Sequence, residues 1–82
     1  MKAIKEIYSE YKEAEKRANY AELNLSEDEF DKAVDEECEK LDELVNAVVK
    51  MANGALRDFD VRQMVMNPKY AKRFESIICN MA

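Results

Sequence analysis

The sequence predicts an all-α fold: a small helical bundle of two long antiparallel helices, followed by a short helix and a C-terminal helix. Apolar residues recur at alternating three- and four-residue steps through most of the chain, which is the spacing of one helix face. One Gly and one Pro leave little of the turn chemistry that strands need. With 82 residues, the chain is expected to form a single helical domain, residues 1–82, with a core of limited size.

The first long helix is predicted over residues 2–23. Its apolar stripe has large side chains in the first half and alanines in the second: Ile4, Ile7, Tyr11, Ala14, Ala18 and Ala21. Because alanine lets two backbones approach closely, we expect tight pairing with the second long helix near residues 14–21. The large side chains should fill a wider space at the other end. Tyr20 and Leu23 lie off the stripe, which indicates either the end of the helix or a second contact surface.

The second long helix is predicted over residues 27–53 and organises the bundle. Ser26 and Glu29 have the spacing of a capping box, in which the serine oxygen accepts a hydrogen bond from the Glu29 amide. Asn53 and Gly54 tolerate the left-handed backbone that commonly ends a helix. The apolar stripe is Val34, Cys38, Leu41, Val45, Val48 and Ala52, widened by Leu44, Val49 and Met51. A stripe this wide needs neighbours on more than one side.

The rest of the chain predicts a short helix over residues 61–66 and a last helix over residues 68–80. Asp60 and Gln63 repeat the capping-box spacing, and Phe59 with Met64 repeats the apolar contact that often accompanies it. The Asn-Pro step at 67–68 supplies a good N-cap and a favoured first residue, although it is also compatible with a kink in one longer helix. The last stripe is Tyr70, Phe74, Ile77 or Ile78, and Met81.

The residue types present argue against catalysis. The chain has no histidine, so the common zinc and haem sites and the Ser-His and Cys-His catalytic arrangements cannot be assembled. We therefore expect no enzyme activity, no cofactor and no metal site. Cys38 lies on the core stripe and is interpreted as a small buried apolar residue, with a disulfide to Cys79 or a redox role as alternatives. No apolar run approaches the ~18 residues of a membrane span, and a cytoplasmic location is expected.

Charge is distributed unevenly along the chain, whose net charge is −5. Residues 26–49 contain ten acidic and two basic residues, whereas residues 50–82 contain three acidic and six basic ones. Acidic pairs recur every seven residues on the central helix and define a candidate partner-binding acidic face: Asp28, Glu29, Asp35, Glu36, Glu39, Asp42 and Glu43. This face is either a solvated surface, neutralised in part by C-terminal basic residues, or a binding surface for a basic partner.

A candidate basic cluster, Lys69, Lys72 and Arg73, opens the last helix. Together with the short helix before it, the segment 60–78 has the outline of a helix-turn-helix. The turn lacks the usual glycine, and the negative net charge opposes binding to a phosphate backbone. Binding of nucleic acid is therefore the least favoured interpretation of this segment.

The sequence favours a small acidic protein-protein interaction module without catalysis, with a regulatory or structural role and a protein partner of unknown identity. Self-association is expected because a wide apolar stripe in a short chain needs more cover, and a homodimer is the simplest closed assembly. The alternative is an inhibitor of the phage or mobile-element type, whose acidic face occupies a basic nucleic-acid-binding surface on a host protein. These two interpretations use different faces of the same helix.

Overall fold

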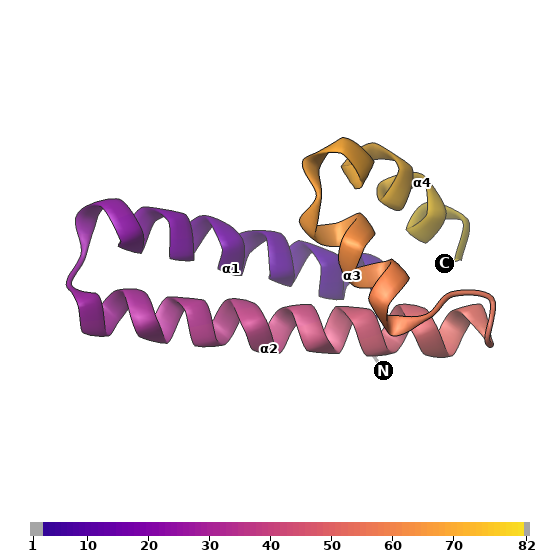
Figure 1. Ribbon diagram of the computed structural model, residues 1–82, viewed down its shortest axis with the longest axis horizontal. Coiled ribbons are helices and arrows are strands. Elements are labelled where there is room, and N and C mark those ends of the chain that lie inside the picture. Colours follow the sequence, from indigo (N-terminus) through magenta and orange to yellow (C-terminus); the bar gives the residue numbers. More distant parts are fainter. Residues whose placement is uncertain (1–2, 82) are drawn as a thin grey trace.

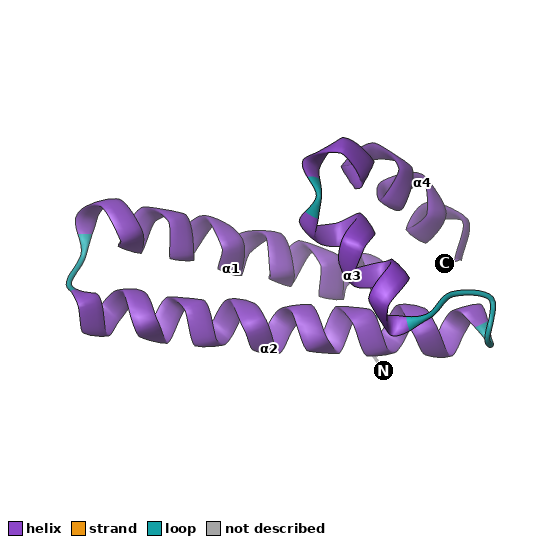
Figure 2. Cartoon of the chain, viewed as in Figure 1, coloured by secondary structure: helices purple, strands orange, loops and turns teal. Residues whose placement is uncertain are grey.

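The computed structural model describes residues 3–81 as a long helical hairpin with two shorter helices packed at one end (Figure 1). The helices are α1 (Ile4–Asn24), α2 (Glu27–Ala52), α3 (Asp58–Met66) and α4 (Ala71–Met81), and a 3-10 turn (Pro68–Tyr70) precedes α4. These residues contain helices and connecting loops but no strand (Figure 2). The predicted all-α fold is confirmed. None of the described helices has a stretch long and apolar enough to cross a membrane.

Helix α2 determines the length of the molecule. At about 1.5 Å per residue, its 26 residues span almost the whole 41 Å of the longest dimension. The hydroxyl of Ser26 accepts the predicted hydrogen bond from the amide of Glu29, at 3.3 Å. At the other end, Asn53 and Gly54 adopt φ angles of 50° and 92°, so the predicted left-handed ending is confirmed. The predicted start of α1 at residue 2 lies outside the described residues.

The stripe predicted for α1 is buried at every position: Ile4, Ile7, Tyr11, Ala14, Ala18 and Ala21. The stripe of α2 is buried only in its second half, at Leu41, Leu44, Val45 and Val48. In the first half, Val34 is half-buried and Cys38 is exposed, so the interpretation of Cys38 as a buried residue is wrong. The reason is the limited reach of α3, whose last residue, Met66, is itself 64% exposed and lines a small hollow together with Cys38.

Helices α3 and α4 close a compact core against the start of α1 and the second half of α2 (Figure 1). Phe74 and Val61 are completely buried there, and the ring of Tyr8 tilts against Phe74 with centroids 5.4 Å apart. The phenol of Tyr8 donates a hydrogen bond to Glu75, at 3.0 Å, which ties α1 to α4. The buried residues of this core are Ile4, Ile7, Tyr11, Leu41, Leu44, Val45, Val48, Val61, Phe74 and Ile78.

The predicted start of the short helix is wrong. Helix α3 begins at Asp58, and Asp60 lies inside its first turn and not at the N-cap. Two carboxylates in the first turn are favourable because they face the positive end of the helix dipole. Arg62 adds a hydrogen bond to Asp58 at 2.7 Å. Phe59, predicted to make an apolar contact with Met64, is instead 68% exposed.

The Asn-Pro step is a helix break and not a kink. Asn67 has an extended backbone, with φ −96° and ψ 115°, and its side-chain oxygen accepts a hydrogen bond from the amide of Lys69 at 3.0 Å. The chain then makes one 3-10 turn before α4 begins. On α4, Phe74 and Ile78 are buried, whereas the side chain of Met81 lies outside the described part. Tyr70, the last residue of the 3-10 turn, is 37% exposed.

Candidate interaction surfaces

The carboxylates predicted as one acidic face form two rows on α2. At 3.6 residues per turn, residues 28, 35 and 42 lie about 100° around the helix from residues 29, 36 and 43. The first group continues at three- and four-residue steps into an outer row: Asp28, Asp31, Asp35, Glu39 and Asp42. The second group is an inner row: Glu29, Glu36 and Glu43. Asp31 is not among the residues predicted for the acidic face, although its spacing to Asp28 and Asp35 places it in this row.

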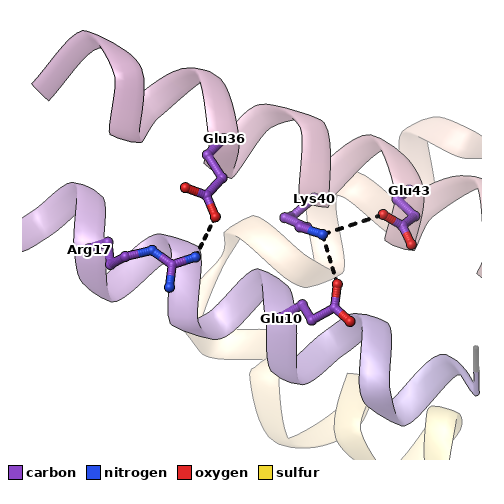
Figure 3. A network of polar contacts seen from close by, with 5 residues as sticks. All are labelled: Glu10, Arg17, Glu36, Lys40 and Glu43. Atoms are coloured by element: carbon purple, nitrogen blue, oxygen red, sulfur yellow. Dashed lines mark hydrogen bonds and ion pairs between the residues drawn. The ribbon is translucent and has the colours of Figure 1, made fainter. Parts of the chain in front are cut away.

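The inner row follows the seam between α1 and α2. Arg17 of α1 donates a hydrogen bond to Glu36 (Figure 3). Lys40 donates a hydrogen bond to Glu10 of α1 at 2.7 Å, and its ammonium group lies 3.8 Å from Glu43 (Figure 3). The hydrogen bond with Glu10 raises the pKa of Lys40. Glu36 therefore pairs across the seam and Glu43 pairs within α2, which makes both carboxylates less available to a partner.

The outer row faces away from this seam. Its last member, Asp42, is bonded to Arg62 of α3 at 2.7 Å, and this arginine also bonds Asp58. The other four carboxylates are exposed and have no ion pair within the described residues: Asp28, Asp31, Asp35 and Glu39. The structure thus divides the acidic face. Glu36, Asp42 and Glu43 pair with internal cations, whereas Glu29 and the first four members of the outer row do not pair within the described residues.

The basic cluster does not neutralise α2, contrary to the sequence-based interpretation. Lys69, Lys72 and Arg73 are exposed and make no ion pair with the part of the chain that is described. The ammonium group of Lys69 lies 5.9 Å from the centre of the Tyr70 ring. The cations that do neutralise α2 come from α1, α2 and α3: Arg17, Lys40 and Arg62.

The helix-turn-helix outline over 60–78 is present as α3, the break at Asn67, and α4. One face of α4 is committed to the core through Phe74 and Ile78. The basic cluster is exposed, with Lys69 in the 3-10 turn and the other two residues in the first turn of α4. Asp58 and Asp60 place negative charge in the preceding helix. Nucleic-acid binding by this segment stays a prediction that the geometry does not favour over the alternatives.

A shallow groove lies between α1 and α2 where the hairpin turns. It encloses about 510 Å³ and is lined by Lys16, Arg17, Tyr20, Ala21, Leu25, Glu29, Lys32, Ala33 and Glu36. Tyr20 is 60% exposed and Leu25 is 45% exposed, so large apolar side chains meet solvent here. A second hollow of about 360 Å³ continues along the same flank and shares Arg17 and Glu36 with the first. We call the first hollow the hairpin groove.

A smaller hollow lies between α1, α2 and the end of α3, where Tyr11, Glu15, Glu37 and Cys38 meet. Burial raises the pKa of Glu37, and the neighbouring charge of Glu15 raises it further. The phenol of Tyr11 donates a hydrogen bond to Glu15 at 3.2 Å. Among the described residues, no group of three or more His, Cys, Asp or Glu side chains is placed to hold a metal ion. Both cysteines are free thiols.

Comparison of the chain with protein-family models, with curated proteins and with solved structures gives no match. The class that the fold itself defines is a small all-α protein with a long antiparallel hairpin.

Proposed function

We propose that this chain is a small non-catalytic protein-interaction module with a regulatory or structural role, and that its hairpin groove is the surface that binds. The observation that carries the proposal is the exposure of Tyr20 and Leu25 beside this groove. Large apolar side chains on a concave, uncovered surface are typical of protein-binding sites. A cytoplasmic location is part of the proposal and is supported by the two free thiols.

The groove offers apolar anchors within a charged rim. Ala21 and Ala33 are small and let an incoming side chain approach the two helices, while Tyr20 and Leu25 supply contact area. Lys16, Lys32 and Glu29 add charge at the edges. In such an interface the apolar centre provides most of the affinity, and the charged rim mainly affects the association rate and its dependence on salt.

The second candidate is an acidic inhibitor that occupies a basic nucleic-acid-binding surface of another protein. The observation that favours it is the outer row, in which Asp28, Asp31, Asp35 and Glu39 lack cations from the described part of the chain. Unpaired like charges along a helix raise the local negative potential and attract a basic surface. They also oppose helix formation slightly, and a binding role would offset that cost.

The two proposals are separated by one pull-down from cells with matched variants. The groove variant is Tyr20→Ser with Leu25→Ser, and the outer-row variant is Asp28→Asn, Asp35→Asn and Glu39→Gln. All five positions are exposed, so both variants should keep the helical circular dichroism of the wild type.

The module predicts that the groove variant loses the captured partner while the outer-row variant retains it. The inhibitor predicts the reverse, together with a steep loss of binding when salt is added. Capture by both variants at wild-type level would contradict both proposals.

A further inference from the structure

The hairpin groove lies on a part of the molecule that no other described helix covers. Helices α3 and α4 pack around the opposite end of the hairpin, and α1 and α2 extend beyond them to the turn at residues 25–26 (Figure 1). The residues of α1 that are buried near the groove are Ala14, Ala18 and Ala21. Because alanine buries little apolar area, this part of the hairpin gains little from internal packing.

The rim of the hairpin groove carries both signs of charge. Arg17 and Glu36 are already paired with each other across the seam. Two positive side chains and one negative side chain of the rim have no ion pair within residues 3–81: Lys16, Lys32 and Glu29. A partner of a single strong charge would be attracted to part of this rim and repelled by the rest. A partner whose surface also carries both signs fits it better.

We infer that the occupant of the hairpin groove is a second copy of this chain, so that two hairpins pack face to face into a four-helix bundle. In a two-fold interface the same patch meets itself, which requires apolar groups at the centre and both signs at the edge. The lining of the groove has both kinds of group, with Tyr20 and Leu25 as large apolar side chains and two lysines and a glutamate that have no ion pair within residues 3–81. This inference rests on the proposed interaction role and names its partner.

A second hairpin packed on the groove would also bury apolar area at the end of the molecule where little is buried within one chain. Four-helix bundles bury apolar residues between facing helix pairs, and a chain of this size has too small a core to do so at both of its ends. Ala33, which lines the groove and is only half-buried, would allow a facing helix to approach closely. The exposed ring of Tyr20 would then become the largest side chain buried on assembly.

The test is self-association measured by sedimentation equilibrium from low to high micromolar concentration. The wild type is expected to pass from the 9.5 kDa monomer to a dimer. The variant Tyr20→Ser with Leu25→Ser should dissociate about thirtyfold more easily or stay monomeric, with unchanged helical circular dichroism. Phe59→Ser is the matched control, because Phe59 is similarly exposed but lies outside the groove, and it should dimerise like the wild type.

Charge reversal makes the test specific for a second copy. Lys16→Glu with Lys32→Glu gives a rim without free cations, and Glu29→Lys gives one without a free carboxylate. Each variant alone should self-associate about tenfold more weakly, and an equimolar mixture should form a heterodimer near wild-type strength. A wild type that stays monomeric at high micromolar concentration, or a mixture that associates no better than its components, would overturn the inference. If partner capture still depends on Tyr20 and Leu25 in that case, the proposed function survives without the second copy.

Discussion

The two ends of the hairpin differ in what holds them together. At the four-helix end, formed by residues 4–11, 41–52, 58–66 and 71–78, aromatic and branched side chains are completely buried, with Phe74 and Leu44 among the largest. At the hairpin end, residues 14–24 and 27–37, the buried side chains are alanines. Stabilisation by burial scales with apolar area, so most of it is concentrated at the four-helix end.

Ion pairs join helices toward both ends: Lys40–Glu10 and Arg62–Asp42 lie toward the four-helix end, and Arg17–Glu36 crosses the α1–α2 seam at the hairpin end. Arg17 and Glu36 pair across the seam while about half of each side chain remains exposed, and pairs of this kind contribute little to stability. The four-helix end therefore supplies most of the stability of the fold, whereas the hairpin end carries the surface proposed to bind a partner.

The largest effect is expected in the four-helix core. Phe74→Ala should lower the free energy of unfolding by about 3–5 kcal/mol, because the ring is 0% exposed and its removal leaves a cavity between α4 and α1. Urea denaturation measures this loss, and Phe74→Leu, which keeps most of the volume, gives a value if the alanine variant does not fold. A loss below about 1 kcal/mol for Phe74→Ala would contradict the assignment of the core.

The next effect tests the close approach of α1 and α2 at the hairpin end. Ala14→Leu should destabilise the chain by about 1–3 kcal/mol, since Ala14 is 0% exposed and the larger side chain would force the helices apart. Asn19→Leu is the matched control because it places the same new side chain at an exposed position of the same helix, where it has room. It should melt close to the wild type. Equal melting temperatures for the two variants would show that the alanines do not set the helix spacing.

A smaller effect is expected at the start of α2. Ser26→Ala removes the hydrogen bond from the amide of Glu29 and should cost about 1 kcal/mol. Ser26→Asp keeps a side-chain acceptor next to the helix dipole and should restore most of this loss in thermal melting. If Ser26→Ala melts like the wild type, the cap contributes nothing measurable to the hairpin end.

The smallest effect concerns pH and Glu37, the last residue of the hairpin end on α2. Because burial raises the pKa of Glu37 above its ordinary 4.5, the folded chain binds this proton more tightly than the unfolded chain does. The ionised carboxylate therefore opposes folding at neutral pH, and this opposition disappears as the pH falls through the raised pKa. Glu37→Gln should raise the melting temperature at neutral pH and make no difference in acid. A lower melting temperature for Glu37→Gln at neutral pH would contradict this assignment.

The sequence predicted well those features that one helix determines by itself. The stripe of α1, the cap at Ser26 and the left-handed ending at Asn53 depend on local spacing and backbone preference, and each is found in the structure. The break at Asn67 was left open because an Asn-Pro step permits either geometry, and a side-chain hydrogen bond to the Lys69 amide accompanies the break. Predictions from local sequence failed where contacts with neighbouring helices determine burial or the start of a helix.

Cys38 and the start of α3 show why these predictions failed. Cys38 continues the stripe of α2 in sequence, but it is buried only if α3 reaches far enough to cover it, and periodicity carries no information about that reach. At α3, Arg62 bonds Asp58 in its own helix and Asp42 in α2, and this long-range contact accompanies an earlier helix start than the capping pattern predicted. Of the two residues that lie off the stripe of α1, Tyr20 lines the hairpin groove and Leu23 does not.

The most direct test of the contrast between the two ends is amide hydrogen exchange resolved by residue, at low and at high micromolar concentration. The slowest exchange is expected at residues 41–48 and 74–78, where it is limited by global unfolding. Faster exchange is expected at residues 14–21 and 30–36 through local opening, and only the hairpin end should become more protected at high concentration. Uniform protection along the hairpin, unchanged by concentration, would contradict both the difference in stability between the two ends and dimerisation through the hairpin end.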